Sequence, residues 1–138
     1  MKKIINTAFA YLIVGLASGV FFREFTKLND FTGYSQVNVL HTHTLMLGMF
    51  MFMIVALFVA KFDMVKEKSF KVFYITYNLG LIMTLIMMSV RGVTQVLSIE
   101  LAKGPNAAIS GMSGLGHIIM SVGLVALFMT LRKVADNK

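Results

Sequence analysis

Three histidines and one arginine are the side chains of this sequence whose type and setting favour chemistry. His41 and His43 are separated by one residue, Arg91 follows in another apolar stretch, and His117 lies further along the chain. A charged side chain at the centre of a membrane-spanning helix costs about 3 kcal/mol, so an ionisable group at that depth marks a functional site by default. Because neutral imidazole binds metals and haem iron, the histidines favour a metal or haem site.

Four long apolar stretches must position these residues. The chain is 57% hydrophobic and only 14% charged, whereas a soluble domain has roughly 25% charged residues. A membrane-spanning helix needs about 20 apolar residues. We therefore expect a single transmembrane domain covering residues 1–138, with spans at about 4–25, 37–60, 70–99 and 105–131. The short connections predict an all-α, antiparallel up-down-up-down four-helix bundle, in which Gly104 ends the third helix and Pro105 opens the fourth.

The basic residues predict how the bundle is oriented. If the amino terminus is inside, nine Lys and Arg residues lie on the inner side and three on the outer side, with Arg91 in the membrane. The inner residues are Lys2, Lys3, Lys61, Lys66, Lys68, Lys71, Arg132, Lys133 and Lys138. This bias predicts a protein of the cytoplasmic membrane with both termini in the cytoplasm. The net charge of +7 then indicates contact with anionic lipid, not with nucleic acid.

The polar residues of the last two spans fall on stripes when each residue turns the helix by about 100°. In the third span the stripe contains Gly80, Thr84, Met88, Arg91, Gln95 and Ser98. In the fourth span it contains Ser110, Ser113, Gly114, His117 and Ser121. Small and hydroxylated residues beside one histidine suit an inward face or the wall of a cofactor slot, although such residues also mediate ordinary helix packing.

His41 and His43 point about 200° apart on a regular helix, so they do not bind one metal together. We expect one to be a ligand and the other a bystander, and the sequence does not choose between them. Gly48 lies seven residues after His41 and shares its face, which leaves room for a flat group or a close helix. All three histidines and Arg91 are predicted to lie in the outer half of the membrane.

A b-type haem held between the second and fourth spans fits this set. Its iron would be bound by His117 and by His43 or His41, while Arg91, with Arg23 or Gln95, would pair with a propionate. Ser113, Gly114 and Gly48 would be the small residues beside the porphyrin. With both axial positions filled, electron transfer, haem handling or haem sensing is favoured over catalysis. The competing interpretation has the histidines bonded to neighbouring carbonyls and Arg91 extending to the interface.

Two other ligand classes remain open. Methionine and histidine together suit copper(I), and Met46, Met49, Met51, Met53, Met112 and Met120 lie on the histidine-bearing spans. Methionine is also a common packing residue. The third hypothesis is a quinone-binding or accessory subunit without a metal. Disulfides, thiolate metal sites and iron–sulfur clusters are excluded, since there is no cysteine. The Gly15-x-x-x-Gly19 spacing suits close helix packing or a homo-oligomer.

The run Gly15 to Lys27 (GLASGVFFREFTK), followed by His41-Thr42-His43 and Leu47-Gly48, resembles a family of small four-span bacterial membrane proteins of unknown function. The pattern His-x-His-x-x-x-Leu-Gly is also distantly similar to a motif of haem- and copper-containing membrane proteins related to the catalytic subunits of haem-copper oxidases. That resemblance implies a low-spin haem on His117 and on His43 or His41. Three histidines are too few for the second haem and copper centre of those enzymes, so it implies electron transfer and not oxygen or nitric-oxide reduction.

Overall fold

The computed structural model describes residues 1–136 and contains, within them, four long helical spans and no strand. Lys138, counted above among the inner basic residues, lies outside the described residues. The elements are α1 (Lys2–Leu28), α2 (Val37–His43), the π-helix η1 (Thr44–Phe50), α3 (Met51–Lys61), the 3₁₀ turn η2 (Met64–Lys66), α4 (Lys68–Val96) and α5 (Lys103–Asp136). Segments α2, η1 and α3 together form the second span.

Each of the four spans is long and apolar enough to cross a membrane, at 27, 25, 29 and 34 residues. Helices suit this environment because they satisfy every interior backbone hydrogen bond within the segment. The prediction of an all-α protein with four membrane-spanning helices is confirmed. Length and composition thus indicate a multi-pass membrane protein in contact with lipid.

The ends of the last two spans differ from the expected boundaries. Helix α4 ends at Val96, and Ser98 has a left-handed φ of 53° outside the helix. The expectation that Ser98 continues the polar stripe of the third span is therefore wrong. Helix α5 begins at Lys103, so Pro105 lies in its first turn, where the missing N–H of proline leaves no hydrogen bond unmade.

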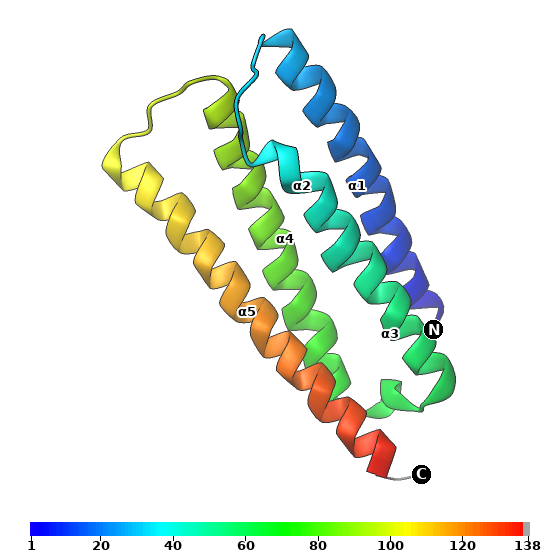
Figure 1. Ribbon diagram of the computed structural model, residues 1–138. Helices are drawn as coiled ribbons and strands as arrows, with labels where there is room; N and C mark the ends of the chain where they lie inside the picture. The colour runs from blue at the N-terminus through cyan, green and yellow to red at the C-terminus, as the bar shows by residue number, and fades with distance from the viewer. Residues whose placement is uncertain (137–138) are drawn as a thin grey trace.

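Successive spans run in opposite directions, and Met1 lies at the same end of the bundle as the last turn of α5 (Figure 1). Helix α4 lies between α5 and the second span (Figure 1). Helix α1 packs against α2, η1 and α3, whereas α5 packs along α4 and touches η2. The second span and α5 thus meet the same helix from two sides.

The largest buried aromatic cluster lies in the half of the bundle near η2. Phe52 of α3 is fully buried, and its ring centroid lies 5.9 Å from that of Tyr11, 6.0 Å from that of Phe73 and 5.9 Å from that of Tyr77. Aromatic pairs at these separations add to the stability that burial provides. This half of the bundle is firmly packed, and the histidines belong to the opposite half.

Glycines bring α4 and α5 into close contact. A Cβ added to Gly80 would lie 2.5 Å from both the carbonyl oxygen of Gly116 and the backbone nitrogen of Met120. A Cβ on Gly123 would lie 2.8 Å from the backbone nitrogen of Tyr77. Small residues allow such backbone approach in membranes, and here they fix the position of α5 against α4.

Candidate functional site

His41 faces α1. Its ring stacks on Phe22 with centroids 6.4 Å apart and planes 9° apart. A Cβ added to Gly19 would lie 3.7 Å from the His41 Cβ. The His41 Nδ1 atom is buried and has no hydrogen-bond partner among the described residues. Its imidazole is therefore part of the contact between α1 and α2.

His43 makes a different contact on the same helix. Its Nδ1 lies 2.9 Å from the carbonyl oxygen of Val39, four residues earlier. A carbonyl only accepts hydrogen bonds, so Nδ1 carries the proton and donates it. In a neutral imidazole, Nε2 then keeps its lone pair. This hydrogen bond gives His43 the tautomer of an Nε2 metal ligand.

The π-helix η1 begins directly after His43, and sequence reasoning missed it. The prediction assumed a regular helix over 37–60, whereas residues 44–50 are π-helical. The Leu47 carbonyl in this segment accepts a hydrogen bond of 2.9 Å from the Tyr77 hydroxyl of α4. Short π-helical insertions are frequent at functional sites. No local sequence signal distinguishes this segment, since its contacts come from α1 and α4.

Gly48 lies within η1, and helix α1 packs closely against it. A Cβ at Gly48 would collide with the ring of Tyr11 from α1. His41 and Gly48 both face α1, as their predicted common face requires. The space beside Gly48 is filled by Tyr11, so the structure gives Gly48 a role in packing and not in holding a flat ligand.

His117 on α5 repeats the arrangement of His43. Its Nδ1 lies 2.8 Å from the carbonyl oxygen of Ser113, which again places the proton on Nδ1 and the lone pair on Nε2. The His117 side chain is exposed. Cβ atoms added to Gly111 and Gly114 would meet nothing within 4 Å. The surface of α5 beside His117 is therefore open.

The expectation that the polar stripe of the fourth span faces the bundle interior is wrong. Its members Ser110, Gly114, His117 and Ser121 are exposed, and Ser113 is half-buried. The buried residues of α5 are Ile109, Gly116, Met120, Gly123, Ala126, Leu127 and Thr130. The glycines determine which face of α5 packs against α4, because Gly116 and Gly123 allow a closer approach to α4 than the polar stripe does.

The depth of His43 follows from the contact between α2 and α4. Gly92 of α4 lies against the start of α2, since a Cβ added to it would lie 2.5 Å from the backbone nitrogen of Val37. His43 is six residues beyond Val37, or roughly 9 Å along the helix axis at 1.5 Å per residue.

The depth of His117 follows in the same way from α4 and α5. A Cβ added to Gly116 would lie 2.6 Å from the Thr84 Oγ1 atom, and Thr84 is eight residues before Gly92, or roughly 12 Å. His117 is one residue beyond Gly116, and α5 runs in the same direction as α2 (Figure 1). His43 and His117 therefore lie within roughly 5 Å of each other in depth.

Arg91 connects α4 to the start of α5. Its Nη1 atom donates to the Asn106 Oδ1 atom at 3.0 Å, and its Nη2 donates to the Asn106 carbonyl at 3.2 Å and to Ser110 Oγ at 2.7 Å. Three of its five N–H donors are thereby used. Gln95, expected to assist Arg91, instead accepts a hydrogen bond of 2.8 Å from the Gln36 backbone. Gln95 thus joins α4 to the start of the second span.

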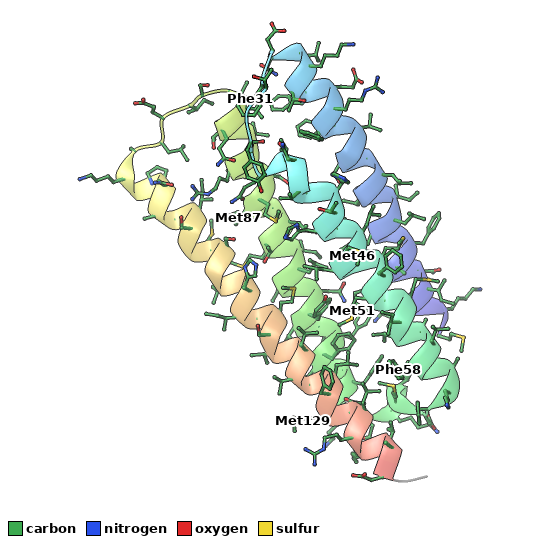
Figure 2. The ribbon with its side chains drawn as sticks, viewed as in Figure 1. Phe31, Met46, Met51, Phe58, Met87 and Met129 are labelled. Atoms are coloured by element: carbon green, nitrogen blue, oxygen red, sulfur yellow. The ribbon has the colours of Figure 1, made fainter. Side chains whose placement is uncertain are left out.

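Four of the twelve methionines lie well apart. Figure 2 shows Met46, Met51, Met87 and Met129 at separate positions on η1, α3, α4 and α5. Met46 is 59% exposed and Met120 only 8% exposed, so the two face different surroundings. Within residues 1–136, no group of three or more His, Cys, Asp or Glu side chains is placed to hold a metal ion. A site formed by two histidines does not depend on such a group.

A protein-family model matches nearly the whole chain. No curated protein and no solved structure matches the chain. The model of a family described as a protein of unknown function (DUF2871) matches residues 1–134. That match includes all three histidines and Arg91. The chain therefore belongs to the DUF2871 family.

Proposed function

We propose that this protein binds one b-type haem through His43 and His117, between the second and fourth spans, and serves in electron transfer or in haem handling or sensing. The proposal rests on one hydrogen bond that both histidines make. Each donates from Nδ1 to the carbonyl four residues earlier, at 2.9 Å for His43 and 2.8 Å for His117. Axial histidines of haem need this hydrogen-bonded imidazole with a free Nε2 lone pair.

The positions of the two histidines support the same conclusion. They lie at similar depth on two helices that both contact α4. Open space at Gly114, three residues before His117, suits a flat porphyrin, whereas the space at Gly48 is filled. His41 is turned toward α1, so we assign it to packing and His43 to ligation. These two imidazoles are the donor set that would hold the iron of a bis-histidine haem.

Arg91 would contribute to binding at the edge of the site. It lies next to Gly92, toward the loop ends of α2 and α5, which places it roughly 8 Å in depth from His43. Its N–H groups beyond the three bonded to Asn106 and Ser110 are suited to a propionate carboxylate. When bound, the haem would supply one-electron redox chemistry, and His43 and His117 would hold its iron.

The topology belongs to the same proposal. The excess of basic residues at the end of the bundle near Met1 supports a cytoplasmic location for that end and for both termini. His43, His117 and Arg91 would then lie in the outer half of the cytoplasmic membrane. The pattern His-x-His-x-x-x-Leu-Gly, which resembles a motif of haem-containing membrane proteins, is in keeping with haem as the ligand. A redox partner or a quinone would exchange electrons at that side.

The absorption spectrum of the purified protein tests the proposal. We expect a Soret band, with sharp α and β bands after reduction by dithionite, and we expect both to be lost in His117→Ala. A colourless protein after expression with added haem would overturn the haem assignment. Metal analysis of the same preparation separates the copper alternative, because a His and Met site would retain copper without these bands.

A further inference from the structure

A second feature of the molecule is a long groove between α1 and α4, on which none of the histidines lies. Its volume is about 880 Å³. The lining residues on α1 run from Lys2 to Ser18, and those on α4 run from Tyr74 to Ser89. Leu40 and Thr44 of the second span also line it. From Lys2 to Ser18 the groove is roughly 24 Å long, at 1.5 Å per residue, compared with a hydrocarbon core of about 30 Å.

The walls of this groove suit a hydrocarbon chain. Ala10, Val14, Ile82, Leu85 and Ile86 supply apolar surface along its length. An unpartnered groove of this size in a membrane is filled by lipid or by another hydrophobic molecule, since water does not solvate it favourably.

The hydroxyl hydrogens of the tyrosines in the groove are already donated. The Tyr11 hydroxyl donates to the Asn78 Oδ1 atom at 2.9 Å. Thr7 Oγ1 donates to the Lys3 carbonyl, so the Tyr74 hydroxyl donates to Thr7 across 2.6 Å. These bonds tie α1 to α4 and leave neither phenol hydrogen for a quinone carbonyl.

One end of the groove is cationic. Lys2 and Lys3 line it there, and the Lys3 Nζ atom lies 4.5 Å from the centroid of the Tyr74 ring. No acidic residue lines the groove. The ion pairs described in residues 1–136 involve neither Lys2 nor Lys3, because they join Arg23 to Glu24, Lys66 to Asp63 and Lys133 to Glu67. Two ammonium groups without a carboxylate partner thus stand at the mouth of an apolar channel.

We propose that the groove binds one anionic phospholipid of the surrounding membrane. Its phosphate lies against Lys2 and Lys3, and one acyl chain runs along the groove between α1 and α4. A basic residue near anionic lipid contributes about 1 kcal/mol. Apolar walls alone would accept any lipid, so the two lysines supply the preference for a negative headgroup. This site is independent of the haem proposal because the two share no residue.

Lipid titration in detergent, followed by native mass spectrometry, tests the site. Dioleoylphosphatidylglycerol and dioleoylphosphatidylcholine have the same chains but different headgroup charge. We expect the protein to prefer the anionic lipid, and Lys2→Gln/Lys3→Gln to weaken its binding roughly 30-fold, equal to about 2 kcal/mol. Purified protein is used so that altered membrane insertion in the cell does not enter the result.

A matched control removes the same charge at the same end of the bundle. Lys68→Gln/Lys71→Gln should leave anionic lipid binding within a few-fold of the original, since neither residue lines the groove. Ala10→Leu should weaken both lipids, because it fills the channel. Equal binding of both lipids, equal effects of the two lysine double variants, or a quinone as the molecule extracted with the protein would each overturn the proposal.

Discussion

The close contact between α4 and α5 makes Gly80→Ala an informative perturbation. Its Cβ would lie 2.5 Å from the Gly116 oxygen and from the Met120 nitrogen. Ordinary contact begins near 3.4 Å, so the helices must separate by roughly 0.9 Å, the difference between those distances. Because both opposing atoms are backbone, we expect a cost near the upper end of the range for overpacking, about 3 kcal/mol. A gain in helix propensity of about 1 kcal/mol offsets part of it. The net loss of unfolding free energy should be about 2 kcal/mol.

Gly111→Ala is the matched control, because a Cβ there meets nothing within 4 Å. It should leave stability unchanged or raise it by up to about 1 kcal/mol. Unfolding of both variants is measured by circular dichroism while SDS is added to the protein in mild detergent. Gly80→Ala should also lower the amount of bound haem, since it displaces Gly116 and the adjacent His117. If Gly80→Ala were as stable as Gly111→Ala, the described contact between α4 and α5 would be incorrect.

Three further predictions use other parts of the structure. A Cβ added at Gly114 meets nothing within 4 Å, so Gly114→Leu should lower haem content, measured by pyridine haemochrome, without lowering the thermal unfolding midpoint. Unchanged haem content would contradict a porphyrin beside α5. Arg91→Gln loses charge-assisted hydrogen bonds to Asn106. The SDS titration should therefore show that the free energy of unfolding falls by about 2 kcal/mol. An unchanged free energy would mean that these bonds do not stabilise the bundle. The hydrogen bond to Asp63 raises the pKa of Lys66 above its usual 10.5. The pKa of Lys66 is higher in the folded than in the unfolded protein. The contribution of this ion pair to stability is therefore complete below pH 10.5 and is lost as the pH rises through the raised pKa. Lys66→Gln should therefore flatten that alkaline decline in thermal stability, and an unchanged decline would argue against the ion pair.

The sequence alone predicted the four spans, because the charge-free stretches are long compared with the membrane. It also predicted that His41 and His43 face different ways, since two residues on a helix differ by about 200°. It left both open as the proposed ligand. The proposal of His43 rests on the position of α1, because Gly19 and Phe22 of α1 contact His41.

The direction of the polar stripe on α5 was not predictable from periodicity. Periodicity groups Ser110, Gly114 and His117 on one face but does not say which face meets α4. Gly116 and Gly123 decide it through backbone contacts that depend on the partner helix. The π-helix after His43 escaped prediction for the same reason, since Tyr77 of α4 bonds to its backbone. Tertiary contacts determine such features, and a single sequence carries no local signal for them.

Ligation of haem by His43 and His117 is tested by the haem-to-protein ratio of three single variants, His41→Ala, His43→Ala and His117→Ala, expressed with added haem. Each is first checked for helix content and for a single size-exclusion peak. We expect His43→Ala and His117→Ala to lose the reduced α band and most bound haem, and His41→Ala to retain both. Loss in His41→Ala with retention in His43→Ala would contradict the assigned ligand. Absence of haem from the unmodified protein would overturn the haem proposal itself.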